Sequence, residues 1–116
     1  MINQLPTVIS CDEVDGGVVL ALAIDMDIPC VQGHFPDISV VPGVAQVDWV
    51  MQLARRQLAL QGRFAGMDAI KFQQLLRPGM HCQLTLEWLE AKRQLRFRYV
   101  DGDAVFSSGR IHLAAS

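Results

Sequence analysis

Two side chains between residues 33 and 52 have the chemistry of a general base and a general acid. His34 has an intrinsic pKa near ~6.5, so at neutral pH its imidazole is mostly unprotonated and can accept a proton. Asp48 follows fourteen residues later and lies beside an apolar stripe of a predicted helix. Because burial disfavours the charged form of a carboxyl, Asp48 could act as an acid.

The start of that helix could supply a third function. Pro42-Gly43 is a typical helix start, and the first backbone N–H groups of a helix have no partner within it. Together with the positive end of the helix dipole they can receive a partly negative oxygen, and glycine permits close approach. The N–H of Gly43 or Val44 is the expected donor. Taken one by one, these features also fit structural roles, such as a loop histidine bonded to the chain or an Asp48–Arg55 pair.

One helix and several strands must position these groups. Apolar residues recur at spacings of three and four and predict a helix from about 43 to 60, ending near Gly62, with one face formed by Val44, Val47, Met51, Ala54 and Leu58. Residues 25–42 contain three prolines and no periodic pattern, which indicates a loop.

The remaining patterns indicate strands. After a short segment around residues 7–11, residues 18–24 are apolar on both faces and predict a strand buried on both sides. Period-two alternation predicts antiparallel strands over about 69–76, 83–88, 95–99 and 105–113, with a hairpin turn at Asp101-Gly102. The expected architecture is α+β, a curved antiparallel sheet wrapped around one long helix, in a single domain over residues 1–116.

Composition excludes several classes of protein. With 51% hydrophobic residues and a net charge of −2, the chain resembles neither a nucleic-acid binder nor a disordered tail. Three cysteines without a CxxC pair suggest neither a disulfide framework nor a zinc site, and we expect no metal and no cofactor. The N-terminus lacks the pattern of a secretory signal, so we expect a soluble cytoplasmic protein.

Charge is distributed unevenly along the chain. Residues 1–54 carry seven acidic residues and no lysine or arginine, whereas residues 55–116 carry ten basic and five acidic residues. Chance and solubility account for such a distribution, but a basic face that docks an acidic partner is the functional alternative.

The stretch from residue 32 to residue 52 resembles a known active-site segment. It reads Gln-Gly-His-Phe-Pro, then Val-Val-Pro-Gly-Val-Ala-Gln-Val-Asp-Trp, then Gln52 four residues after the acid. This pattern resembles the hot-dog-fold 3-hydroxyacyl-(acyl-carrier-protein) dehydratases, and most of all the short dehydratase-like branch found with aryl polyene biosynthesis. The motif covers about twenty residues, and the order of elements extends the likeness with lower specificity.

The resemblance implies specific roles. His34 and Asp48 would be the catalytic residues of a dehydration that yields a trans-2-enoyl thioester. The Gly43 amide would bind the thioester carbonyl and the Val40 carbonyl would orient the imidazole. The substrate-binding residues would be Gly43, Val44, Val40, Phe35 and Gln52.

The resemblance also implies partners. In this family the histidine and the acid of one site come from different subunits, which predicts a homodimer or a higher even oligomer with paired sites. The substrate would be a 3-hydroxyacyl group on the phosphopantetheine of acyl carrier protein, an acidic protein that basic side chains could steer to the site. We expect the docking residues to be Arg77, Lys92 and Arg93.

Two departures from the family motif leave alternatives open. Asp37 stands where the family usually has glycine, and Ser39 stands where it usually has proline. A thioesterase of the same fold would also place an acid on this helix, although it would not generally need the His-Phe-Pro loop. A non-catalytic subunit that binds acyl carrier protein is the third possibility.

Overall fold

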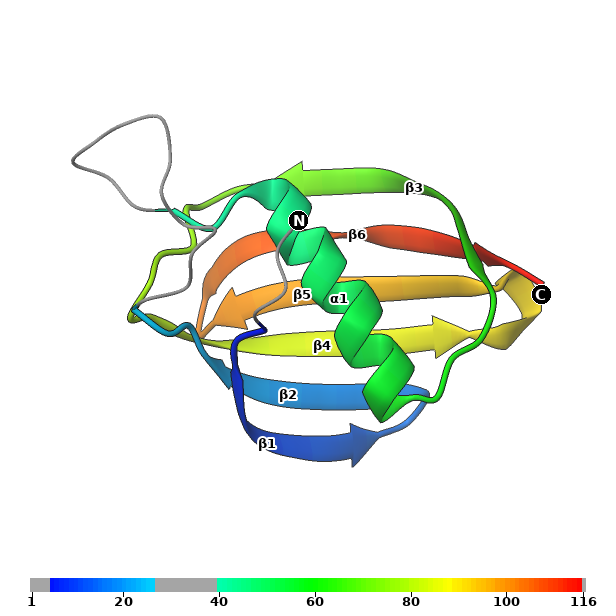
Figure 1. Cartoon of the computed structure of the whole chain (residues 1–116), viewed down its shortest axis with the longest axis horizontal. Coiled ribbons are helices and arrows are strands. Elements are labelled where there is room, and N and C mark those ends of the chain that lie inside the picture. Colours follow the sequence, from blue (N-terminus) through cyan, green and yellow to red (C-terminus); the bar gives the residue numbers. More distant parts are fainter. Residues whose placement is uncertain (1–4, 27–39, 116) are drawn as a thin grey trace.

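The computed structural model describes residues 5–26 and 40–115, and within these ranges a single α-helix lies across a curved antiparallel sheet (Figure 1). In chain order the elements are β1 (Thr7–Val14), β2 (Gly17–Ala23), α1 (Gly43–Gln57), β3 (Arg63–Phe72), β4 (His81–Leu89), the short 3₁₀ helix η2 (Glu90–Lys92), β5 (Gln94–Asp101) and β6 (Ala104–Ala114). The expected order of two strands, one helix and four strands is confirmed.

The six strands form one sheet in the order β1-β2-β4-β5-β6-β3. Strands β4, β5 and β6 are neighbours in sequence and in space, as the alternation predicts, and β5 turns into β6 at Asp101-Gly102. Strand β3 pairs with β6 rather than with β4, so β3 and β1 are the two edge strands. The edge position of β3 matters because this strand faces the start of the helix.

The core lies between α1 and one face of the sheet. The helix buries Trp49 and Leu53 completely, so Trp49 is a packing residue. Alternate residues of the strands meet it, among them Leu20, Leu84 and Phe97. In β2 only this face is fully buried within the single chain, because the alternate residues are half-buried, whereas the sequence predicted burial on both faces.

The predicted helix face coincides only in part with the most deeply buried face of α1. The buried helix residues are Ala45, Gln46, Trp49, Val50, Leu53 and Ala54. Of the predicted stripe only Ala54 belongs to them, while Val44 is 76% exposed. Three residues of the predicted stripe, Val44, Val47 and Met51, line a groove, and Val47, Met51 and Leu58 also pack against the core.

Strand β3 begins earlier and ends earlier than predicted, at residues 63 and 72 rather than about 69 and 76. Its pairing with β6 shifts register twice, between Phe64 and Gly66 and between Asp68 and Lys71, and Ala69 has a positive φ of 54°. Each β-bulge inserts a residue and interrupts the alternation of side chains. The period-two pattern is therefore absent from the first half of this strand.

Candidate functional site

A groove of about 480 Å³ runs between α1 and β3. Its helix side is formed by Gly43, Val44, Val47, Asp48 and Met51, and its strand side by Phe64, Met67, Ile70 and Phe72. Every lining residue except Asp48 is apolar or glycine, and Phe64, Met67 and Phe72 are about half exposed. The volume and the apolar lining suit the chain of an acyl ligand, with one carboxyl among hydrocarbon walls.

Asp48 is half-buried in this groove, and its carboxyl has one identified partner. The Nε2 group of Gln52 donates a hydrogen bond to Asp48 Oδ2 at 2.7 Å, one helical turn further on. The alternative structural role, a pair of Asp48 with Arg55, is absent from the part of the chain that the structure describes, and Arg55 donates to the Gly62 carbonyl. The groove therefore holds a carboxyl oriented by an amide, and Gln52 is bonded to the acid predicted from the sequence.

The start of α1 opens into the same groove. The N–H groups of Ala45 and Gln46 both donate to the Pro42 carbonyl, at 3.0 and 3.1 Å, so the amides of Gly43 and Val44 lie outside the helical pattern. The Phe72 ring lies directly over Gly43, and a methyl group on Gly43 would lie 2.5 Å from the ring tip. The structure thus brings together Asp48, Gln52, Gly43 and Val44.

Two of the predicted site residues, His34 and Phe35, lie outside the described residues. Val40 is described, and it adjoins Val41, whose N–H donates to the Leu76 carbonyl at 2.7 Å. This bond joins the segment before α1 to the segment between β3 and β4. The roles of His34, Phe35 and Val40 stay predictions.

A buried polar network beneath the helix start was not predicted from the sequence. Gln46 is 4% exposed; its Nε2 group donates to the Val41 carbonyl at 3.1 Å, and its Oε1 accepts from Ser107 Oγ at 2.6 Å. The Tyr99 hydroxyl donates to the Gln46 main-chain carbonyl at 2.7 Å. The sequence held one signal that Gln46 is buried. Gln46 lies three residues before Trp49 and four before Val50, so it belongs to the same helix face as these apolar residues.

Burial fixes the protonation state of two groups near this network. Burial, followed by the charges of Cys82 and Asp48, holds the pKa of Tyr99 well above its usual range, so Tyr99 is a neutral donor. Burial, followed by the charge of Asp101, raises the pKa of Cys82 to about 12, so Cys82 is a neutral thiol at physiological pH. Within residues 5–26 and 40–115, no three His, Cys, Asp or Glu side chains are grouped to hold a metal ion.

The three predicted docking residues lie at two ends of the sheet. Arg77 is exposed and follows Leu76, the residue bonded to Val41, so it lies at the end where α1 begins. Lys92 and Arg93 follow β4, a strand of nine residues that spans roughly 27 Å, at the other end. The Arg93 guanidinium donates to three carbonyls, those of Gln61, Leu113 and Ala114, and lies 5.6 Å from the Trp88 ring centre. These contacts give Arg93 a structural function at that end.

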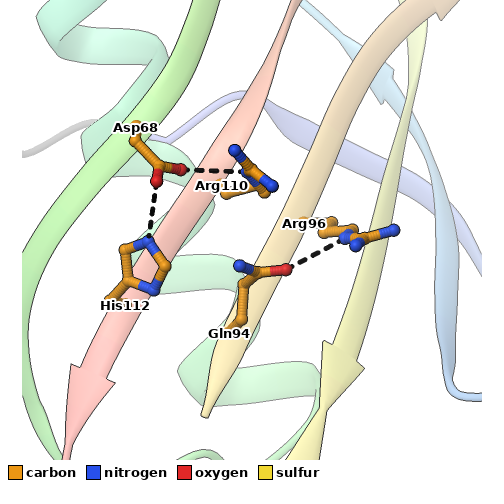
Figure 2. A network of polar contacts seen from close by, with 5 residues as sticks. All are labelled: Asp68, Gln94, Arg96, Arg110 and His112. Carbon is orange, nitrogen blue, oxygen red and sulfur yellow. Dashed lines mark hydrogen bonds and ion pairs between the residues drawn. The ribbon is translucent and has the colours of Figure 1, made fainter. Parts of the chain in front are cut away.

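Further basic residues line the sheet face opposite α1. A second groove, of about 520 Å³, includes Lys71, Arg96, Arg98 and Arg110. Asp68 offsets part of this charge, because its carboxylate pairs with Arg110 at 2.9 Å and with His112 at 3.4 Å, while Arg96 donates to Gln94 at 3.0 Å (Figure 2). Much of the basic excess of residues 55–116 therefore lies away from the Asp48 groove.

Comparisons with known proteins agree with this fold. A family model described as "ApeI-like: ApeI dehydratase" matches residues 10–110. The 3-hydroxyacyl-(acyl-carrier-protein) dehydratase FabZ of Oleidesulfovibrio alaskensis is 32% identical over 92 residues, which are 68% of this chain and 60% of that protein. FabZ of Clostridium perfringens is 32% identical over 108 residues, 84% of this chain and 77% of that protein.

Two solved structures match almost the whole chain. A chain of the dehydratase heterocomplex ApeI:P from Xenorhabdus doucetiae is 35% identical, with a TM-score of 0.88, and the match covers 97% of this chain and 100% of that one. An uncharacterized protein from Erwinia carotovora subsp. atroseptica is 38% identical, with a TM-score of 0.82, over 96% and 97% of the two chains.

These matches show both the fold and the family of the chain. One helix against a curved six-stranded antiparallel sheet is the hot-dog architecture of the matched structures. The family model covers most of the sequence, and the chain belongs to the ApeI-like dehydratase family. The resemblance inferred from the His-Phe-Pro and Pro-Gly-Val motifs is confirmed.

Proposed function

We propose that this chain dehydrates a 3-hydroxyacyl thioester, carried on acyl carrier protein, to the trans-2-enoyl thioester. The proposal extends to a role in fatty-acid or aryl-polyene-type biosynthesis in the cytoplasm. The observation that carries it is the Asp48 carboxyl in an apolar groove, one turn from the amides of Gly43 and Val44, which lie outside the helical hydrogen-bond pattern. The chain spans 60% of the length of its Oleidesulfovibrio relative, whose name states this reaction.

In the proposed mechanism three groups act on the substrate. The His34 imidazole removes a proton from the carbon next to the thioester carbonyl, and negative charge develops on the carbonyl oxygen. The Gly43 amide, with the helix dipole behind it, stabilises that charge; one such donor is typically worth about 10²–10³ in rate. Protonated Asp48 gives its proton to the departing hydroxyl group, so water leaves and a carbon–carbon double bond forms.

The product of the reaction tests this function. Purified protein is mixed with a 3-hydroxyacyl thioester, and the enoyl absorbance and the free thiol are followed together. Dehydration produces enoyl absorbance without free thiol. Free thiol without an enoyl product would instead assign thioester hydrolysis, and neither product would indicate the non-catalytic subunit. No step of the proposed reaction requires a cofactor or a metal ion.

The exposed apolar face of β3 supports a proposal for where a second subunit binds. Phe64, Met67 and Phe72 expose about half of their surface on an edge strand, and Val44 is 76% exposed beside them. Apolar edge strands with open hydrogen-bonding groups are normally covered. We propose that a second copy of this chain covers this face, and that the subunit boundary completes the Asp48 site.

A charged side chain introduced on this face of β3 is expected to separate the two subunits. Met67→Asp costs the free chain little, because Met67 is 50% exposed, but it would bury an unpaired carboxylate in the dimer. We expect the dimer dissociation constant to rise at least about 100-fold, measured by light scattering across a dilution series. The matched control is Ile9→Asp on the other edge strand, where Ile9 is 57% exposed.

The outcomes of this comparison are distinct. Dissociation by Ile9→Asp and not by Met67→Asp would place the interface on β1 and contradict the proposal. A wild-type chain that is monomeric alone, and dimeric only with a second hot-dog chain, would replace the homodimer by a heterocomplex. The ApeI:P structure from Xenorhabdus doucetiae is described as a heterocomplex, which makes co-expression with a second hot-dog chain the natural test.

Carrier docking is proposed at the end of the sheet where α1 begins. Arg77 is the exposed base nearest in sequence to the Leu76–Val41 contact at this end. We expect Arg77→Glu to raise KM about tenfold for a carrier-bound substrate, since reversing a rim charge slows association with an acidic partner. KM for a small thioester without the carrier should stay unchanged. Lys92→Glu tests the opposite end of the sheet. A higher KM for the carrier-bound substrate in Lys92→Glu, without a higher KM in Arg77→Glu, would place the docking site at that end instead.

A further inference from the structure

We propose that Gln46 is a positioning residue that holds the start of α1 in the orientation the reaction needs. Its side-chain amide donates to the Val41 carbonyl at 3.1 Å, and its main-chain N–H donates to the Pro42 carbonyl at 3.1 Å. One residue therefore binds the carbonyls of the two residues that immediately precede Gly43. This inference rests on the proposed function, because it concerns the amides that would bind the thioester carbonyl.

The network ties this arrangement to the sheet. Gln46 Oε1 accepts from Ser107 on β6, and the Gln46 main-chain carbonyl accepts from Tyr99 on β5. Ser107 and Tyr99 are fully buried and Gln46 is nearly so. Inside a protein such bonds are stronger than in water, and an unpaired member is costly. The first turn of α1 is thus fixed to two central strands by buried hydrogen bonds.

The segment before the helix is held from its other side as well. The Val41 N–H donates to the Leu76 carbonyl at 2.7 Å, while the Val41 C=O accepts from Gln46. Both peptide groups that flank Val41 are therefore fixed. Because a trans peptide is planar, the Val41 N–H bond to Leu76 also sets the direction of the Val40 carbonyl. Gln46 and Leu76 together determine how the backbone enters the groove.

Small displacements of the backbone at the start of α1 are expected to lower the rate of catalysis more than the affinity for substrate. The apolar walls of the groove come from side chains such as Met51 and Met67, and Gln46 is not among the lining residues. The carbonyl-binding amides come from the backbone that it holds. A misplacement of about 1 Å at reacting groups can cost about 10²-fold in rate. Loss of the Gln46 side-chain amide should therefore lower kcat and leave KM nearly unchanged.

The first experiment compares two buried glutamines. Gln46→Met keeps the length of the side chain and removes its bonds to Val41 and Ser107. Gln94→Met is the matched control, since Gln94 is 5% exposed and accepts a bond from Arg96 on the outer face of the sheet (Figure 2). We expect a 10- to 100-fold lower kcat for Gln46→Met, with KM within about threefold of wild type, and an unchanged kcat for Gln94→Met. All rates are measured well below the unfolding temperature of the less stable variant.

The second experiment uses the conservative variant Gln46→Glu and pH. A protonated glutamate can donate to the Val41 carbonyl and accept from Ser107, whereas an ionised one presents only acceptors to Val41. Among the described residues, the titratable groups near this position are the neutral Tyr99 phenol from β5 and Asp48 two residues along α1. We expect the ratio of kcat for Gln46→Glu to kcat for wild type to fall at least tenfold as pH rises. The same ratio for Gln94→Glu should stay flat.

Amide hydrogen exchange gives a readout that does not need activity. Gln46→Met should speed exchange at least tenfold in residues 40–45, and Gln94→Met should leave these residues unchanged. Wild-type kcat in Gln46→Met, a flat pH ratio in Gln46→Glu, or an equal loss in both methionine variants would each overturn the positioning role. If wild type forms no enoyl product, the proposed function fails, and exchange alone decides whether Gln46 holds the helix start.

Discussion

Replacing Asp48 by Asn is expected to remove dehydration almost completely while the fold is kept. Asparagine has the shape of aspartate and can still bond with Gln52, but it carries no acidic proton for the leaving hydroxyl. A positioned general acid typically contributes about 10²–10⁴ in rate, so kcat should fall by about that factor. The measurement is enoyl formation from a 3-hydroxyacyl thioester, with the unfolding temperature of the variant recorded in parallel.

Asp68→Asn is the matched control for this substitution. Asp68 is an exposed carboxylate on β3 that pairs with Arg110 and His112 on the face away from the groove. Its loss should leave kcat within about twofold of wild type, because exposed ion pairs contribute little even to stability. An Asp48→Asn variant with more than a third of the wild-type kcat would exclude Asp48 as the acid, even if wild type is a dehydratase.

A methyl group on Gly43 is expected to cause the second large loss. Alanine normally stabilises a helix relative to glycine by about 1 kcal/mol, but here its Cβ would lie 2.5 Å from the Phe72 ring. Either the ring is displaced or the first turn of α1 moves, and both changes disturb the amide that would bind the thioester carbonyl. We expect kcat/KM to fall about 10²-fold, the typical effect of losing one such donor.

The double variant Gly43→Ala/Phe72→Ala separates these two causes. Removing the ring makes room for the methyl group, so activity should recover relative to Gly43→Ala, with Phe72→Ala alone as reference. A coupling between the two positions is expected because they are in direct contact. Full activity together with higher stability in Gly43→Ala would show that the thioester carbonyl does not need to approach Gly43 closely.

The helix shows what periodicity can and cannot predict. The spacing of Val44, Val47 and Met51 correctly indicates a helix, and α1 ends at Gln57, three residues before the expected end. Trp49, Val50 and Leu53 form a second apolar stripe that packs on the sheet. A period of 3.6 identifies a helix but not which of two apolar stripes faces the core. Val44, Val47 and Met51 of the predicted stripe line the groove beside Asp48, whereas Ala54 of the same stripe is buried in the core.

Strand β3 shows the limit of the period-two rule. Phe64, Met67, Ile70 and Phe72 all line the groove, although they are spaced by three, three and two residues. Two register shifts in the pairing with β6 produce this spacing, and nothing local in the sequence marks both of them. The pairing of β3 with β6 depends on contacts distant in sequence. In contrast, Asp101-Gly102 is a local turn signal, and the β5–β6 hairpin was predicted correctly.

The part of the site that lies within the sequence motif could be predicted. Asp48, Gly43 and Val44 were proposed from their places on one helix, and the structure brings them to one groove. The Gln46 network was missed because its partners, Tyr99 and Ser107, lie 53 and 61 residues away in sequence. Hydrogen bonds between such distant residues depend on the tertiary fold, whereas a helical face is a local property.

The two β-bulges of β3 also restrict how this strand can change its length. Because each bulge already places one extra residue of β3 against β6, a residue inserted or deleted elsewhere in the paired strand would shift the following side chains to the other side of the sheet. Met67 and Ile70 would then exchange sides with charged neighbours such as Asp68 and Lys71, and the wall of the acyl groove would become ionic. In this strand, substitutions that keep size and polarity are tolerable, but a single-codon insertion or deletion outside the bulges would place charged side chains in the groove wall.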